Sequence, residues 1–331
     1  MKPSNGYHQF IFTGPYAGLC AKFMDNKRYL GFKYYEAGQW LRMFDNYCSR
    51  TRCAVPAAPD KTLVKKFLNS VSYLTPKSKS NILGILRQFG LFLSSLNYKP
   101  YIPPVQKLSV GEFVPHIYSK NEVKRLLASV RNMKVNLRSP YMHAVLLTIM
   151  RVLYGCGLRV SEAVNLLKSD VDLEEGILLI RESKFEKDRL IPMSASLISV
   201  CRQYVQDPAI LSASNSYFFP APDRGPMSTS TIRERFQTML SKTGIGRHSE
   251  GCPRLHDLRH TFAVHCLQRW ARAGVDVMTA LPILPTYLGH DDIKATCRYL
   301  RLTAELFPEI SMTMSKMYHG VFPEVVNAEA Y

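Results

Sequence analysis

The 331-residue sequence has no hydrophobic run long enough to cross a membrane. Its longest apolar stretch, Tyr141 to Met150, contains His143 and stops at Arg151, whereas a spanning helix needs about 18 or more apolar residues. Residues 1–20 also lack the apolar core, basic flank and small-residue cleavage site of a secretory signal. These absences predict a chain that is neither embedded in a membrane nor secreted.

Cysteine is sparse and irregularly spaced. The eight cysteines are Cys20, Cys48, Cys53, Cys156, Cys201, Cys252, Cys266 and Cys297. Scattered cysteines in a chain of this length are typical of reduced intracellular proteins rather than of small disulfide-bonded domains. We therefore expect a cytoplasmic location. The sequence also contains no internal repeat and no low-complexity segment.

Acidic residues are scarce, above all in the first third of the chain. The sequence carries 43 Lys and Arg against 26 Asp and Glu, a formal net charge of +17. Residues 1–105 hold 15 of the basic residues but only four acidic ones, so most of the surplus lies there. Such an excess favours a polyanionic partner, and without a membrane segment we interpret that partner as nucleic acid.

The first third is predicted to form a basic helical domain, residues 1–106. At roughly 150 residues per domain, the chain length favours two domains. Apolar residues recur at helical spacing in residues 34–47, 63–68 and 82–96, and no convincing strand pattern occurs before residue 105. The candidate DNA-binding residues are Lys61, Lys65, Lys66, Lys77, Lys79 and Arg87. The alternative for any one of them is a solvated position without a partner.

A proline-containing segment separates this domain from the rest of the chain. Residues 97–116 contain little periodicity and four prolines, Pro100, Pro103, Pro104 and Pro115. Such composition is typical of an interdomain linker. We place the linker at residues 107–118 and a second domain at residues 119–331.

The second domain begins with a helix-capping pattern. Ser119 and Glu122 have capping-box spacing and precede apolar residues at helical intervals. Residues 140–154 are apolar on nearly every side, which predicts a core helix ended by Gly155 and Gly157. Further helices are predicted at about 195–206, 229–243 and 256–273, with shorter ones to residue 317.

One β-hairpin is predicted among these helices. Residues 177–181 and 189–192 have strand-like composition, and the polar residues 182–188 between them form the turn. The predicted fold class is therefore mainly α with a small antiparallel β-sheet, an α+β fold.

Three polar clusters could carry chemistry. The first, residues 157–163, places Arg159 in a glycine-rich turn just before a helix that Ser161 could cap. Taken alone, it also fits a loop arginine that pairs with a nearby acid. Its meaning therefore depends on the other two clusters.

The other clusters contain histidines and a tyrosine. His256 and Arg259 lie three residues apart at a predicted helix start, so they share one face and could bind an anion. His256 could instead be a capping or core histidine. Residues 287–290, Tyr-Leu-Gly-His, are followed by Tyr299 nine residues after His290. A lone tyrosine there would fit a packed core position.

Together these residue types suit chemistry on a phosphodiester. A tyrosine oxygen can displace the 5′ oxygen of DNA and form a phosphotyrosine, if other groups stabilise the added charge and protonate the leaving oxygen. Two guanidiniums can clamp the nonbridging oxygens, and histidine or lysine can transfer the protons. No metal ion or other cofactor is required.

The order and spacing of the clusters resemble a known family. Gly157–Glu162, a hairpin lysine, His256–His260, Leu288–His290 and Tyr299 resemble the catalytic boxes of the tyrosine recombinase (phage integrase) family. The longer runs 259–265 and 286–290 resemble integrases of transposons and other mobile elements. The resemblance covers residues 115–310, whereas residues 1–106 match the family's core-binding domain only in general character.

The resemblance implies a role for each matching residue. The implied catalytic residues are Tyr299 as nucleophile, Arg159 and Arg259 as the phosphate clamp, and His256 and His290 as proton-transfer or phosphate-binding groups. Glu162 would orient the cations. The general acid toward the leaving oxygen would be Lys184, with Lys187 as the alternative because the turn lacks the usual glycines. Pro282 and Pro285 are expected to interrupt the helix before His290.

The implied function is site-specific DNA strand exchange through a 3′-phosphotyrosyl intermediate, serving integration, excision or transposition of a mobile element. The implied partners are double-stranded DNA and a homotetramer that joins two duplexes through a Holliday junction. No cofactor or metal is expected, and the location would be the nucleoid. We also expect residues 307–331, which include Met312, Met314, Met317 and Phe322, to dock on a neighbouring protomer.

Three alternatives remain open at this point. One is a zinc site, because six potential ligands crowd a short segment: His248, Cys252, His256, His260, His265 and Cys266. A zinc-dependent nuclease would leave Arg159, Arg259 and Tyr299 without a role. The others are a DNA-binding protein without chemistry and a type IB topoisomerase-like enzyme that cleaves without strand exchange.

Overall fold

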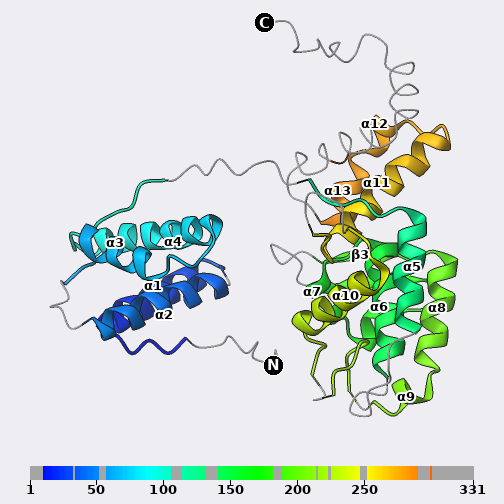
Figure 1. The fold of residues 1–331 in the computed structure, drawn as a ribbon, viewed down its shortest axis with the longest axis horizontal. Coiled ribbons are helices and arrows are strands. Elements are labelled where there is room, and N and C mark those ends of the chain that lie inside the picture. The colour runs from blue at the N-terminus through cyan, green and yellow to red at the C-terminus, as the bar shows by residue number, and fades with distance from the viewer. Residues whose placement is uncertain are drawn as a thin grey trace, which may run out of the picture. The chain divides into compact units, whose positions relative to one another are not determined.

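In the computed structural model, the chain folds into two compact units, Met1–Phe113 and Val114–Tyr331 (Figure 1). The structure describes residues 10–32, 34–51, 57–105, 114–131, 141–181, 188–213, 215–222, 225–246, 252–289 and Tyr299. The division falls within the segment predicted as a linker. Each unit has a hydrophobic core of its own.

The described part of the first unit contains α1 (Ala17–Tyr29), α2 (Tyr35–Arg50), α3 (Lys61–Ser70) and α4 (Pro76–Ser95). Its core is rich in aromatic rings. Phe23 and Phe89 pack edge to face with their centroids 5.5 Å apart, and Phe44 and Phe67 do so at 5.1 Å. Aromatic pairs of this geometry stabilise a core beyond the area that they bury.

The sequence predicted three of these four helices. The patterns at residues 34–47, 63–68 and 82–96 are confirmed as α2, α3 and α4. Helix α1 was missed because its apolar stripe is narrow, with only Cys20, Phe23 and Met24 buried. A helix with so few buried positions gives a weak periodic signal.

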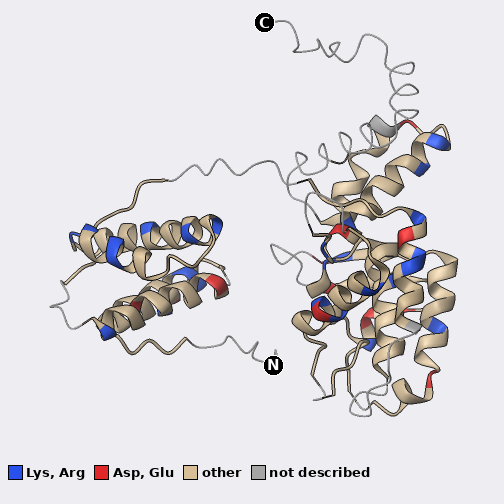
Figure 2. Cartoon of the chain, in the orientation of Figure 1, with Lys and Arg blue, Asp and Glu red and all other residues tan. Residues whose placement is uncertain are grey.

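Basic residues recur along α3 and α4, and neither helix contains an acidic residue (Figure 2). Asp60 stands just before α3, where its carboxylate accepts a hydrogen bond from the backbone N–H of Leu63 at 2.7 Å. Part of the surplus of basic residues counted in the sequence therefore lies on these two helices. None of the described helices combines the length and apolarity that a membrane span requires.

In its described residues, the second unit is a helical bundle with one small sheet. Its described helices are α5 (Lys120–Arg131), α6 (Met142–Cys156), α7 (Val160–Val164), η1 (Lys168–Asp170), α8 (Ala195–Val205), α9 (Pro208–Leu211), α10 (Thr229–Thr243), α11 (Asp257–Arg272), α12 (Val277–Ala280) and α13 (Ile283–Leu288). Helix α6 packs against α5, α8 and α11, so the predicted core helix is confirmed (Figure 1). The predicted capping box is also present, with Ser119 N–H donating to Glu122 at 2.8 Å.

The sheet is antiparallel and has the order β1-β2-β3. Strands β2 (Ile177–Ile180) and β3 (Arg189–Pro192) form the predicted hairpin, and β1 (Val171–Asp172) adds a short edge. Strand β1 was missed because two residues cannot show alternation. The register pairs Ile180 with Arg189 at the end of the hairpin from which the turn departs. The predicted fold class, mainly α with a small antiparallel sheet, is confirmed.

One predicted helix end was wrong. Gly155 lies inside α6, which continues to Cys156 and ends at Gly157. Gly157 has a φ of +60°, and a Cβ at this position would lie 2.5 Å from Cδ1 of Phe262. The left-handed backbone and the close ring together require glycine here.

The predicted cap at Ser161 was also wrong. Ser161 lies within α7, and Arg159 occupies the N-cap position. The carboxylate of Glu162 accepts the Arg159 backbone N–H at 2.9 Å instead. Farther along, the helical structure is interrupted between α12 and α13, and Pro282 is the N-cap residue of α13. The predicted interruption is therefore confirmed at Pro282, whereas the prediction for Pro285 was wrong, because Pro285 lies inside α13.

Candidate active site

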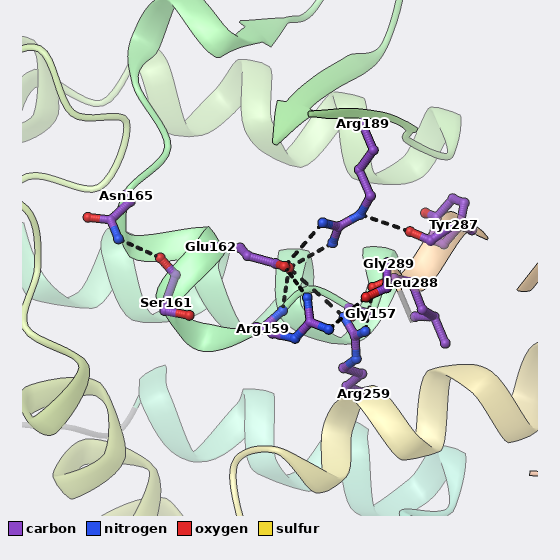
Figure 3. A network of polar contacts seen from close by, with 10 residues as sticks. All are labelled: Gly157, Arg159, Ser161, Glu162, Asn165, Arg189, Arg259, Tyr287, Leu288 and Gly289. Carbon is purple, nitrogen blue, oxygen red and sulfur yellow. Dashed lines mark hydrogen bonds and ion pairs between the residues drawn. The ribbon is translucent and has the colours of Figure 1, made fainter. Parts of the chain in front are cut away.

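Three arginines converge on one buried glutamate in the second unit (Figure 3). Arg159 precedes α7, Arg189 begins β3, and Arg259 lies in the first turn of α11. The glutamate, Glu162, is on α7 and its side chain is only 6% exposed. Elements far apart in the sequence thus meet around a single carboxylate.

Both carboxylate oxygens of Glu162 accept hydrogen bonds. Arg189 donates to Oε1 at 3.1 Å and to Oε2 at 2.8 Å, and Arg159 Nη1 donates to Oε1 at 2.6 Å. Arg259 Nη1 lies 3.9 Å from Oε2. Burial alone would raise the pKa of Glu162, but hydrogen bonds and charge from Arg189, and then from Arg159, lower it. Glu162 is therefore an anion that organises three cations.

Arg259 is buried and held at two points. Its side chain is 1% exposed, Nη1 donates to the carbonyl of Gly157 at 2.8 Å, and Nη2 donates to the carbonyl of Leu288. Burial and then the nearby Arg159 lower its pKa to about 10, while the charge of Glu162 opposes this shift. The guanidinium remains protonated at neutral pH and has a fixed orientation.

The arginines also hold the end of α13. The carbonyls of Tyr287, Leu288 and Gly289 accept hydrogen bonds from Arg189 (3.0 Å), Arg259 and Arg159 (2.8 Å), respectively. The C-terminal carbonyls of a helix carry partial negative charge, so cations stabilise this end. His290, the next residue, lies outside the described residues.

Tyr299 lies beside a pair of histidines. Its Oη is 3.1 Å from Nδ1 of His260, within hydrogen-bond distance, and Tyr299 is 2% exposed. The His260 ring meets the His256 ring edge to face, with centroids 5.0 Å apart. Partial desolvation, then His260 and Arg259, lower the pKa of His256, although part of the residue stays exposed. The lowered pKa favours a neutral His256 imidazole at neutral pH.

The structure thus brings most of the described candidates together. Arg159, Glu162 and Arg259 share one network, and His256 approaches Tyr299 through His260. Lys184 and Lys187 lie outside the described residues, as does His290. The predicted roles of all these residues stay predictions.

Sequence reasoning missed Arg189 and His260 as members of the site. His260 follows Arg259 directly and lies one helical turn after His256, so its position on the same face was a usable signal. Arg189 gave no comparable signal, because its approach to Glu162 depends on the strand register and on α7. Only the folded chain brings the two together.

The ligands of the alternative zinc site do not gather in the described part of the chain. His265 bonds to the hydroxyl of Tyr154 at 2.9 Å, and Cys252 is exposed. Among the described residues, no group of three or more His, Cys, Asp or Glu is placed to hold a metal ion. His248 lies outside them.

The predicted DNA-binding residues lie on α3 and α4. Lys61, Lys65, Lys66 and Lys77 are exposed. Arg87 is half-buried, and its Nη1 donates to the carbonyl of Pro103 at 2.8 Å. The four exposed lysines are therefore the better candidates for contacts with a polyanion.

The sequence matches a known protein family over most of the second unit. The model of the "Phage integrase family" matches residues 117–305, and the chain belongs to that family. The predicted family and the predicted class of enzyme, a tyrosine-type site-specific recombinase, are confirmed.

Curated relatives and solved structures agree. The putative integrase/recombinase y4rB of Sinorhizobium fredii is 31% identical over 310 residues, which cover 90% of this chain and 96% of the relative. The structure of the site-specific recombinase XerH bound to its palindromic difH substrate aligns with a TM-score of 0.60 at 17% identity, covering 89% of this chain and 87% of XerH. The Tn1549 transposon integrase in complex with circular intermediate DNA aligns with a TM-score of 0.58 at 18% identity, covering 85% and 94%. The structural likenesses show a common fold.

Proposed function

We propose that this protein cleaves and rejoins DNA strands through a covalent 3′-phosphotyrosyl intermediate on Tyr299. The observation that carries the proposal is the clustering of Arg159 and Arg259 around Glu162. Tyr299 is hydrogen-bonded to His260, the residue that follows Arg259. A phosphodiester between the guanidiniums and the phenol would meet a nucleophile and a charge clamp together.

The arginine clamp would stabilise the pentacoordinate phosphorane. A guanidinium carries five N–H donors in a planar fork. The contacts of Arg259 with Gly157 and Leu288 use one donor on each terminal nitrogen and leave others for phosphate oxygens. Because Glu162 and the carbonyls already fix the guanidiniums, little reorganisation is needed when charge develops.

The proton transfers would involve His260 and the hairpin. As the bond from Tyr299 Oη to phosphorus forms, His260 accepts the phenol proton, with His256 beside it. The bond from phosphorus to the 5′ oxygen breaks, and that oxygen takes a proton from Lys184, or alternatively from Lys187. The energy of the broken bond is retained in the phosphotyrosine, so the reaction needs neither ATP nor a metal ion.

The proposed partner is double-stranded DNA, bound at the nucleoid by a homotetramer that joins two duplexes. The first unit would hold the DNA backbone through α3 and α4. The predicted docking of residues 307–331 on a neighbouring protomer lies outside the described residues. The y4rB relative is named an integrase/recombinase, and the XerH and Tn1549 integrase structures are DNA complexes. These likenesses support integration, excision or transposition of a mobile element as the biological reaction.

Covalent trapping with a randomised substrate tests this proposal and selects the DNA site at the same time. The protein is incubated with a library of nicked duplexes that carry a randomised segment, so that cleavage releases a short fragment and blocks rejoining. We expect adducts that survive denaturing electrophoresis, form equally in EDTA, and yield a selected duplex on sequencing. DNA breakage that produces no covalent adduct and is abolished by EDTA would contradict the proposal and favour a metal-dependent nuclease. Relaxation of supercoiled DNA regardless of sequence, without strand exchange, would favour the topoisomerase alternative.

Neutralising the exposed lysines of α3 and α4 should flatten the salt dependence of DNA binding. In the combined variant Lys61→Gln, Lys65→Gln, Lys66→Gln and Lys77→Gln, the log-log slope of affinity against salt should fall by about 0.9 for each phosphate that the protein no longer neutralises. The measurement is a titration of the selected duplex at several salt concentrations. The matched control replaces the same four lysines with arginine and should keep the slope. An unchanged slope in the glutamine variant would remove these helices from backbone binding.

A further inference from the structure

We propose that Arg189 is a positioning residue that holds the phosphate clamp in its working arrangement. Its side chain is 11% exposed and reaches from the start of β3 to both oxygens of Glu162 and to the carbonyl of Tyr287 (Figure 3). No step of the proposed chemistry uses Arg189 itself. The inference rests on the proposed function, because it concerns how Arg159 and Arg259 are presented to phosphate.

The first part of this role acts through Glu162. The carboxylate shares Oε1 between Arg189 and Arg159, and it shares Oε2 between Arg189 and the Arg159 backbone N–H. A fork-to-fork pair of this kind fixes the plane of the carboxylate. Without Arg189, a buried anion would be left with fewer donors, and among the described residues Arg259, 3.9 Å away, is its nearest additional partner. Glu162 would then turn toward Arg259 and draw that guanidinium away from phosphate.

The second part acts through α13. Arg189 Nε donates to the carbonyl of Tyr287 at 3.0 Å, and the hydroxyl of Tyr287 donates in return to the carbonyl of Pro192 at 3.4 Å. A Cβ at Gly289, whose φ is +67°, would lie 3.1 Å from Nη1 of Arg189. The end of α13 is therefore shaped to admit this guanidinium. Two hydrogen bonds therefore link strand β3 to α13 beside the arginine clamp.

Arg181 offers a matched comparison. It directly follows β2, while Arg189 begins β3, so the two arginines flank the same turn. Arg181 Nε donates to Asp170 Oδ1 at 2.6 Å, so its ion pair is with Asp170 rather than with Glu162, and its side chain is 51% exposed. Removing Arg181 takes the same charge and one ion pair from the hairpin and leaves the clamp intact.

The experiment measures single-turnover adduct formation by the full-length protein at saturating concentration on the selected nicked duplex. Arg189→Gln should slow cleavage about 100-fold while DNA affinity changes less than about threefold, because misplaced clamp donors act in the transition state. Arg189→Lys keeps one charge and should recover part of the rate. Arg181→Gln should cleave at nearly the rate of the unmodified protein.

A second substrate separates positioning from a general structural loss. A methylphosphonate at the scissile position removes one anionic oxygen, so its transition state depends less on the guanidinium clamp. The defect of Arg189→Gln should shrink at least about tenfold on this substrate, since less charge needs to be stabilised. An equal defect on both substrates, or a rate equal to that of the unmodified protein, would overturn the proposal. Adducts absent from the unmodified protein on both substrates would instead overturn the proposed function.

Discussion

Replacing Arg259 with lysine should slow DNA cleavage by about 100- to 1,000-fold while leaving DNA affinity almost unchanged. The guanidinium is 1% exposed and spans the carbonyls of Gly157 and Leu288 while it faces Glu162. A lysine ammonium keeps the charge but cannot reproduce this planar fork. Loss of one preorganised donor to a developing anion typically has an effect of about this size. The measurement is the single-turnover rate of adduct formation on the selected duplex.

Arg272 provides the control for this substitution. It lies in the last turn of the same helix, α11, and is exposed. Arg272→Lys should therefore retain the full cleavage rate. If Arg259→Lys also cleaved at that rate, Arg259 would not be part of a phosphate clamp.

The second large effect is expected from Tyr299→Phe, which should abolish adduct formation. The phenylalanine ring keeps the packing of Tyr299 against the cluster that contains Val264, Leu267 and Leu288, so the fold should be retained. The variant lacks the oxygen that we propose as the nucleophile, together with its hydrogen bond to His260, a bond worth about 1 kcal/mol to stability. DNA binding and thermal unfolding, measured alongside, should change little.

Tyr118→Phe is the matched control for the tyrosine. Tyr118 is also buried in the second unit, and its hydroxyl donates to the carbonyl of Arg254 at 3.4 Å. This variant loses a buried hydroxyl without losing the proposed nucleophile, so it should still form the adduct. An adduct that persisted in Tyr299→Phe would show that another residue attacks the DNA.

The sequence predicted those parts of the molecule that depend on local pattern. The apolar helix α6, the capping box at Ser119 and the hairpin of β2 and β3 each follow from residues close together in the chain. Helix α1 was missed because it buries a narrow stripe. The predicted helix end at Gly155 was wrong, because α6 continues through this residue. In both cases tertiary packing, rather than local preference, decides the outcome.

The candidate site divides in the same way. Arg159, Arg259 and Tyr299 could be named because their short motifs have a characteristic order and spacing. The ion pair between Arg189 and Glu162 could not be predicted, because it joins a strand to a helix 27 positions earlier in the chain. The hydrogen bonds to the three carbonyls at the end of α13 could not be predicted either, because backbone acceptors have no signature in the sequence.

The most direct test of the central claim is to identify the amino acid that carries the DNA. Adduct formed on the selected nicked duplex is digested with protease and nuclease, and the nucleotide-bearing peptide is sequenced by mass spectrometry. The proposed mechanism predicts that a 3′-phosphoryl nucleotide is attached to Tyr299. Attachment to any other residue, or to the 5′ end of the cleaved strand, would contradict it.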